Sequence, residues 1–279
     1  MSGVYTRLVS MVFSLLPSAK PAHEASPPAI VTVLNDAFVE YFRVLLFSIR
    51  KHNPGFDLPV VILHSRTLSP LSLSQRDQLL SVHANIDFLE VDESPYTSFF
   101  PVTPPRLHPA LLKLEIFAAR GYERLLFLDA DMLCLGDLRE LFALSVPFAA
   151  CPAGKDRAKK ERLRNDFHRR RGFNTGVMMI GKDHLDGRTY TKLLRQRLAP
   201  CPTADQDILN RFFRWKKVYC LDHRYNYHAQ FFWKGDETDV KILHYAGAKP
   251  LEAPKEDRMK VWFAYREEMG RCHGSTVSP

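Results

Sequence analysis

RLLFLDAD, residues 124–131, decides the fold class of this chain, because a short apolar strand runs directly into Asp129-Ala130-Asp131. In an extended chain, residues two apart point to the same side, about 6–7 Å apart along the backbone. One divalent cation could bridge two such carboxylates, and Mg²⁺ and Mn²⁺ prefer oxygen ligands. Ala130 keeps the turn tight. A solvated loop that happens to carry two acids is the alternative interpretation.

Outward from this stretch, predicted strands alternate with predicted helices. Strands are expected at 30–34, 59–64, 86–91 and 124–128, and helices at 37–52, 68–83 and 109–120. This alternation predicts an α/β fold with a Rossmann-like, mainly parallel sheet flanked by helices on both faces. Ligands of such sheets bind at the carboxyl ends of the strands. Asn35 and Asp36 follow the first strand, and Asp129 follows the fourth, so we expect them at one edge.

The composition is that of a globular protein, with 46% apolar and 25% charged residues among 279. We expect one domain over 30–270, a leader or linker over 1–29 and a flexible tail over 271–279. No stretch approaches the roughly 18–20 apolar residues of a membrane-spanning helix. Five scattered cysteines favour reduced thiols and a cytoplasmic protein. Residues 4–16 are a short apolar run that could form a weak signal peptide, which leaves the secretory pathway or a peripheral membrane location as alternatives.

The formal net charge of +8 favours anionic partners without naming one. Much of it comes from residues 155–171, which hold nine Lys or Arg and three acids. This basic segment could be a solvated helix, or it could contact an acidic surface or an anionic acceptor. Phe167 is its only aromatic residue, so we do not expect nucleic-acid binding.

Three further motifs place polar groups at the ends of predicted elements. The sequence FNTGVMMI, residues 173–180, puts Asn174, Thr175 and Gly176 at the head of an apolar strand. The sequence DQDILN, residues 205–210, opens a helix in which Asp205 could simply be the N-cap. The sequence HYAGAKP, residues 244–250, supplies an imidazole, a glycine and an ammonium group. A neutral His244 could complete a metal shell, and Lys249 with the backbone near Gly247 would suit a diphosphate.

Taken in order, these motifs resemble the glycogenin-like glycosyltransferase family 8, whose members are retaining enzymes with a GT-A fold. The resemblance covers roughly residues 30–250. It implies that VTVLNDAF, residues 31–38, is the nucleotide loop, with Asn35 and Phe38 at the base or ribose and Leu34 and Asp36 beside them. It also implies that the lysine of LKLEIF, residues 112–117, reaches towards the donor. One departure is that only Ala248 separates Gly247 from Lys249.

The resemblance implies a retaining transfer of a hexose from a UDP-sugar, with UDP-glucose or UDP-galactose favoured. The acceptor would be a hydroxyl of a glycan, glycoprotein or glycolipid, and a homodimer stays open. Mn²⁺ or Mg²⁺ would be held by Asp129, Asp131 and His244, and Asp205 and Gln206 would be catalytic. The expected donor-binding residues are Leu34, Asn35, Asp36, Phe38, Lys113, Asp129, Ala130, Asp131, Asn174, Thr175, Gly176, His244, Gly247 and Lys249.

Two other classes of protein remain as alternatives. The first is a nucleotidyltransferase that binds UDP-sugars, which would share the sheet type and an acidic metal site. Against it, no glycine-rich phosphate loop follows the first strand. The second is an inactive glycosyltransferase-like scaffold, although all three expected metal ligands are present.

Overall fold

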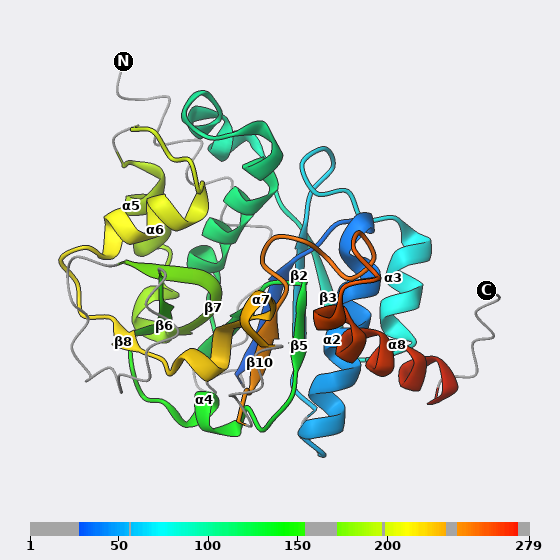
Figure 1. Cartoon of the computed structure of the whole chain (residues 1–279). Helices are drawn as coiled ribbons and strands as arrows, with labels where there is room; N and C mark the ends of the chain where they lie inside the picture. Colours follow the sequence, from blue (N-terminus) through cyan, green and yellow to red (C-terminus); the bar gives the residue numbers. More distant parts are fainter. Residues whose placement is uncertain (1–27, 56, 154–171, 197–198, 233–238, 273–279) are drawn as a thin grey trace.

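The computed structural model describes residues 28–55, 57–153, 172–196, 199–232 and 239–272 (Figure 1). Most of the predicted leader and tail, and the whole basic segment 155–171, lie outside the described residues. Within the described ranges, no helix is both long and apolar enough to cross a membrane. All five cysteines are thiols.

The central sheet has seven strands and confirms the predicted α/β architecture. Its strand order is β3 (Ile86–Glu90), β2 (Val60–His64), β1 (Ala29–Val33), β4 (Arg124–Leu128), β7 (Phe173–Gly181), β6 (Phe148–Pro152) and β8 (Tyr219–Cys220). The first four strands in this order are parallel, and β6 is parallel to β8. Strand β7 is the exception, since it runs antiparallel to both of its neighbours.

The reversed direction of β7 decides where its polar head lies. Leu128 at the end of β4 is paired with Val177, and the Asp129 amide donates to the Gly176 carbonyl at 2.9 Å. The head of an antiparallel strand therefore meets the carboxyl end of β4. In a fully parallel sheet, the same residues would lie at the opposite edge.

Helices cover both faces of the sheet (Figure 1). One face packs against α2 (Val39–His52), α3 (Leu73–Leu80) and α8 (Lys260–Cys272). The other packs against two 3-10 helices, η2 (Ser94–Val102) and η3 (Pro105–Ala118), and against α5 (Arg188–Leu194) and α6 (Asp205–Phe213). Short connecting helices complete the fold: η1 (Asp36–Phe38), α4 (Arg139–Ala143), η5 (Lys182–His184), η6 (His223–Asn226), α7 (Ala229–Phe232) and η7 (Asp257–Met259).

The central strands are buried on both sides, which explains their continuous apolar sequences. Ile30 faces the cluster of α2 and α8, and its neighbour Val31 faces the cluster of η3. On β4, Leu126 likewise faces the cluster of α2 and α8, and Phe127 faces the cluster of η3. Alternate side chains of a strand point to opposite faces, so each strand joins two cores.

The helix expected at 109–120 is present, but it begins at Pro105 and winds as a 3-10 helix. Pro109 lies inside it and carries no backbone N–H, so regular α-helical bonding is interrupted there. This element carries Lys113 into the interior, where the residue is only 6% exposed.

A second, three-stranded sheet brings the end of the chain to the acidic turn. Strand β5 (Met132–Cys134) directly follows Asp131, and β10 (Ile242–His244) pairs with it antiparallel, His244 opposite Met132. On its other side, β10 is parallel to β9 (Tyr227–His228). The Tyr245 amide donates to the Asp131 carbonyl at 2.9 Å, which fixes His244 beside the two acids.

Replacement of Trp262 tests whether helix α8 is part of the hydrophobic core of the domain. The Trp262 ring is fully buried on α8 and lies 5.5 Å from the ring of Tyr41 on α2. Trp262→Ala should lower the free energy of unfolding by about 3–5 kcal/mol, because it leaves a large cavity. The measurement is urea denaturation. Trp215→Ala is the matched control, since that ring is 71% exposed and its loss should change stability by at most about 0.5 kcal/mol.

Candidate metal and donor site

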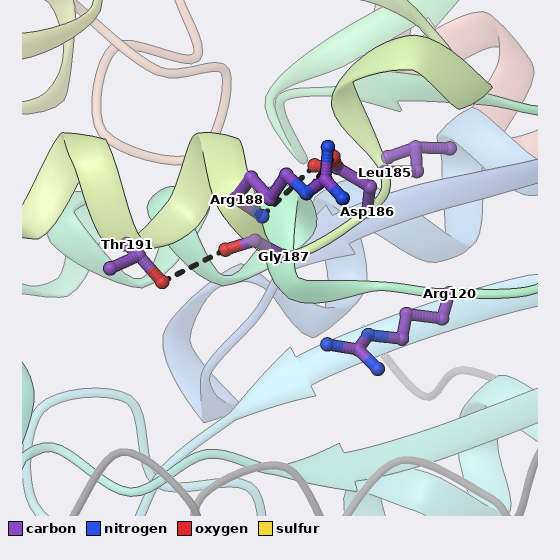
Figure 2. A pocket seen from close by; sticks show the side chains of 6 residues that line it. All are labelled: Arg120, Leu185, Asp186, Gly187, Arg188 and Thr191. Atoms are coloured by element: carbon purple, nitrogen blue, oxygen red, sulfur yellow. Dashed lines mark hydrogen bonds and ion pairs between the residues drawn. The ribbon is translucent and has the colours of Figure 1, made fainter. Parts of the chain in front are cut away.

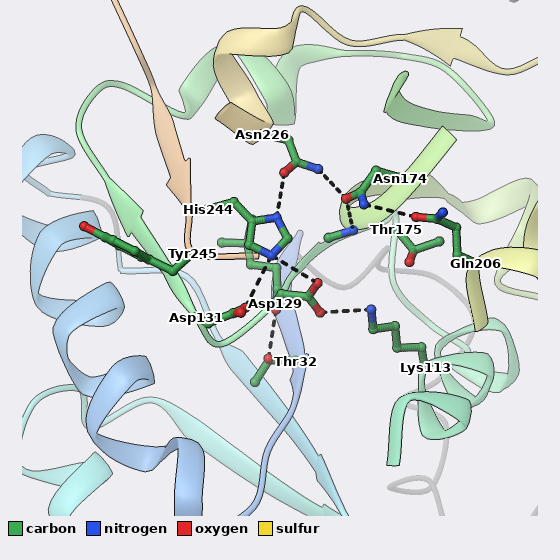
Figure 3. A network of polar contacts seen from close by, with 12 residues as sticks. Thr32, Lys113, Asp129, Asp131, Asn174, Thr175, Gln206, Asn226, His244 and Tyr245 are labelled. Carbon is green, nitrogen blue, oxygen red and sulfur yellow. Dashed lines mark hydrogen bonds and ion pairs between the residues drawn. The ribbon is translucent and has the colours of Figure 1, made fainter. Parts of the chain in front are cut away.

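Asp129, Asp131 and His244 converge at the carboxyl end of β4 (Figure 3). One ligand atom from each residue lies within 4.8 Å of the others. The His244 Nε2 atom is 3.4 Å from Asp131 Oδ1 and 3.8 Å from Asp129 Oδ2. Asp131 and His244 are buried, whereas the Asp129 side chain is 25% exposed and gives the cluster contact with solvent.

The chemistry of these three side chains fits a divalent cation. Burial alone would raise the pKa of Asp131, but His244 and Lys249 hold it well below its usual range, so the carboxylate is ionised. His244 Nδ1 is engaged by Asn226 Oδ1 at 2.8 Å, which leaves Nε2 on the side of the two acids. Two carboxylates and an imidazole nitrogen are a donor set that Mn²⁺ and related ions accept.

Lys113, which the resemblance places near the donor, lies between two acids. Its Nζ atom is 2.9 Å from Asp129 Oδ1 and 3.1 Å from Asp205 Oδ2. Burial opposes the charge of Lys113, yet the two carboxylates raise its pKa above the ordinary value. Burial raises the pKa of Asp205 even though Lys113 and Thr175 counteract it. Lys113 therefore joins η3, the end of β4 and the start of α6 electrostatically.

Asp205 and Gln206 begin α6 and meet the head of β7. Thr175 Oγ1 donates to Asp205 Oδ2 at 2.6 Å, and Asn174 Nδ2 donates to Gln206 Oε1 at 3.0 Å (Figure 3). The Asp205 carboxylate is thus bound by side chains and does not cap its helix through the backbone. The structure brings both predicted catalytic residues next to the predicted sugar-binding strand.

Gly176 is required by close packing. A Cβ atom there would lie 2.7 Å from His244 Cε1 and 3.0 Å from Asn174 Oδ1. Carbon contacts this short do not occur without displacement, so any side chain would require His244, Met132 or Asn174 to shift.

Lys249 joins the acidic cluster to the predicted nucleotide loop. Its ammonium group contacts an Asp131 carboxylate oxygen and donates to the Tyr245 carbonyl at 2.9 Å. The same Nζ atom lies 6.0 Å from the centroid of the Phe38 ring. Gly247 has φ +104°, a conformation that favours glycine, and a Cβ atom there would meet nothing within 4 Å. The short spacing between Gly247 and Lys249 therefore still brings the lysine to the site.

The residues after β1 differ in what they offer a ligand. Asn35 Oδ1 is buried with no hydrogen-bond partner within the described part of the chain, which suits a ligand donor. Asp36 accepts from the Ser72 amide at 2.8 Å and is exposed. The side chains of Leu34 and Ala130 belong to the hydrophobic core.

Asn226 and Tyr245 are site residues that the sequence analysis missed. Asn226 is 1% exposed and touches both His244 and Asn174, and the Tyr245 carbonyl holds Lys249. Asn226 lies in HRYNYH, residues 223–228, which follows no recognised spacing. No local pattern in the sequence marks Asn226 as a site residue.

A separate hollow of about 660 Å³ lies at the start of α5 (Figure 2). Arg188 pairs there with Asp186 at 3.6 Å, and Thr191 donates to the Gly187 carbonyl at 3.0 Å. Arg120 and Leu185 complete its lining. The hollow shares no residue with the acidic cluster, so it is distinct from the predicted donor site.

A mixed sheet with an acidic turn and a buried histidine at one edge is the arrangement of a GT-A type fold, and comparison with solved structures shows this fold. The structure superposes on that of galactosyltransferase LgtC in complex with donor and acceptor sugar analogues with a TM-score of 0.62. The two chains are 19% identical over 90% of this chain and 97% of LgtC, and an active-site mutant of LgtC gives a TM-score of 0.67. This similarity establishes the GT-A fold.

The model of glycosyl transferase family 8 matches residues 29–252, and the chain belongs to this family. Glycogenin of Neurospora crassa is 26% identical over 247 residues, which cover 86% of this chain and 33% of the relative. The glycosyltransferase GlyF of Streptococcus pneumoniae is 26% identical over 255 residues, 86% of this chain and 61% of GlyF. The chain thus spans between one third and three fifths of the length of these two relatives.

Replacement of Lys113 tests the electrostatic link between the acids. Lys113→Met should lower the free energy of unfolding by about 3–5 kcal/mol at neutral pH, because two carboxylates lose their buried cation. The folded pKa of Asp205 lies above its unfolded value, so its ionisation already costs stability as the pH rises. Loss of Lys113 enlarges that cost, and the deficit of the variant should shrink as the pH falls towards about 4.

Denaturant titrations at several pH values measure this deficit. Lys182→Met is the control, because Lys182 is 69% exposed in its pair with Glu123 and should contribute at most about 1 kcal/mol. A deficit for Lys113→Met that stays constant with pH would contradict the link.

Proposed function

We propose that this protein transfers a hexose from a UDP-sugar to an acceptor hydroxyl with retention of configuration. UDP-glucose and UDP-galactose are the favoured donors, and the acceptor is a glycan, glycoprotein or glycolipid. Mn²⁺, or Mg²⁺ in its place, would bind Asp129, Asp131 and His244. The observation that carries this proposal is the convergence of these residues next to Lys249 and the head of β7.

The leaving diphosphate would lie beside the acidic cluster and Lys249. A bound divalent cation supplies Lewis-acid stabilisation of the negative charge on the departing phosphate. Lys249 contributes a fixed positive charge on the same side. The open space at Gly247 allows phosphate oxygens to approach the backbone. The unpartnered Asn35 Oδ1 and the Phe38 ring beside Lys249 support the assignment of the base and ribose to the loop after β1.

Asp205 and Gln206 would face the sugar. An oxocarbenium-like transition state is stabilised by negative or electron-rich groups near the ring. Asp205 Oδ2 is held by Lys113 and Thr175, which supports an electrostatic role for this carboxylate and disfavours attack by it. Front-face attack by the acceptor hydroxyl accords with that arrangement.

A donor-cleavage assay with and without Mn²⁺ distinguishes the proposed activity from its alternatives. Metal-dependent release of UDP from a UDP-sugar supports the transferase. Release of pyrophosphate would instead indicate a nucleotidyltransferase, and UDP binding without turnover would indicate a scaffold.

Loss of one metal ligand should abolish the activity without unfolding the protein. Asp131→Asn preserves the shape of the side chain and removes its charge, so we expect metal-dependent UDP release to fall by about 100-fold or more. Asp137→Asn is the control, because Asp137 lies just beyond β5, is 40% exposed and pairs with Arg139. Full activity of Asp131→Asn would refute the metal role of Asp131.

Lys249 should affect metal and nucleotide binding in opposite directions. Lys249→Met frees the Asp131 carboxylate from its ammonium partner, so Mn²⁺ alone should bind more tightly. UDP in the presence of Mn²⁺ should bind about 10–100-fold more weakly, because one charge-assisted contact is lost. Isothermal titration calorimetry measures both, with Lys260→Met, a 77% exposed lysine, as the control. A parallel loss of both affinities would contradict this assignment.

A further inference from the structure

A chain of amide side chains connects the predicted metal ligand His244 to the predicted catalytic residue Gln206 (Figure 3). Its members come from four separate elements: β10, the end of η6, the head of β7 and the start of α6. In order, they are His244, Asn226, Asn174 and Gln206.

The direction of every hydrogen bond in this chain is set by one backbone group. The Gly176 N–H can only donate, and it donates to Asn174 Oδ1 at 2.9 Å. The atom of Asn174 at this position is therefore the oxygen. Asn226 Nδ2 donates to the same oxygen at 2.7 Å. A reversed Asn226 amide would place two oxygens against each other, so this orientation is fixed as well.

The fixed Asn226 amide determines which ring nitrogen of His244 carries a hydrogen. Asn226 Oδ1 lies 2.8 Å from His244 Nδ1, and an amide oxygen only accepts. Nδ1 must then carry a hydrogen, and the lone pair of the neutral imidazole is on Nε2. That atom faces Asp131 and Asp129 at 3.4 and 3.8 Å. A metal-binding histidine is commonly held in this manner, by a hydrogen bond from its other nitrogen.

The same Gly176 N–H also fixes the amide orientations at the Gln206 end of the hydrogen-bond chain. Because Asn174 Oδ1 is bound by the two donors, its Nδ2 is the atom that faces Gln206 and donates to Gln206 Oε1 at 3.0 Å. The Gln206 amide is thereby oriented with its oxygen towards Asn174. Asn210 Nδ2 donates to the backbone carbonyls of Gln206 and Phe173, each at 2.8 Å, and these bonds hold this turn of α6 against β7.

We infer that Asn226 is a positioning residue that holds His244 in its metal-binding tautomer and, through Asn174, sets the orientation of the Gln206 amide. Asn226 is 1% exposed and contacts neither the acids nor, in the proposed function on which this inference rests, the sugar. Its effect is transmitted through its neighbours. The backbone N–H of Gly176 thus fixes which atom donates and which accepts at both ends of this hydrogen-bond chain.

Different variants separate the effect on His244 from the effect on Gln206. Asn226→Leu removes the acceptor for His244 Nδ1 and the donor to Asn174. Asn174→Asp keeps both acceptor contacts of the Asn174 oxygen and loses only the donation to Gln206. Asn226→Asp keeps the acceptor for His244 and is the second variant if Asn226→Leu does not fold. Asn53→Leu is the matched control, because Asn53 is equally buried and its side chain makes four hydrogen bonds at the end of α2, outside this hydrogen-bond chain.

The test is the tautomer of His244 in the full-length, metal-free protein, read from long-range ¹H–¹⁵N NMR spectra and assigned with His244→Gln. Nδ1 should carry the hydrogen in the wild type, Asn53→Leu, Asn174→Asp and Asn226→Asp, and this preference should be lost in Asn226→Leu. An Nδ1 without hydrogen in the wild type, or an unchanged tautomer in Asn226→Leu, would overturn the inference. Because this measurement needs no catalytic turnover, a negative result here can be distinguished from a failure of the proposed activity.

Calorimetry with Mn²⁺ and UDP, together with UDP-release kinetics, provides the second readout. Asn226→Leu should weaken Mn²⁺ binding about 10–100-fold. Asn174→Asp should bind Mn²⁺ at least as well as the wild type and lower kcat instead. Equal loss of Mn²⁺ affinity in Asn226→Leu and in Asn53→Leu would show that Asn226 is merely structural, and would overturn its positioning role.

Discussion

The buried ammonium group of Lys113 is the charge on which the arrangement of the site depends. It lies within 3.1 Å of carboxylates from the end of β4 and from the start of α6, two elements that would otherwise repel each other. An unpaired buried carboxylate costs several kcal/mol, so the ammonium group stabilises the ionised form of the buried Asp205. It also joins Asp129, on the proposed diphosphate side, to Asp205, on the proposed sugar side. One lysine on a 3-10 helix thus connects the two proposed regions of the site.

Much of the fold could be predicted because its determinants are local. Apolar β-branched runs predicted β1 and β2, and the five apolar-rich residues before Asp129 predicted β4 with its bounds. The rule that ligands bind at the carboxyl ends of parallel strands correctly brought Asp129 and Asp131 to a polar edge. The sequence HYAGAKP offered His244 and Lys249 as a metal ligand and a diphosphate partner, and the family resemblance joined them to the acids. The pairing of β10 with β5 brings both to the turn.

Other features could not be predicted because they arise from contacts distant in sequence. The antiparallel direction of β7 is decided by its pairing with β4 and β6, and periodicity does not report direction. The two acidic partners of Lys113 come from other elements, and no sequence pattern connects them to the lysine. Asn226 is prominent only once three segments are folded together, since a lone asparagine in a short turn carries no pattern. Burial of polar groups, which makes hydrogen-bond direction decisive, is a property of the assembled structure.

The rings of Phe38, Tyr41 and Trp262 follow one another at centroid distances of 5.7 and 5.5 Å. The family model matches residues 29–252, so Trp262 and the rest of α8 lie outside the matched region. The loop after β1 is thus supported by a helix from almost the other end of the sequence. A change in how α8 packs on α2 would therefore reach Phe38 through two aromatic contacts.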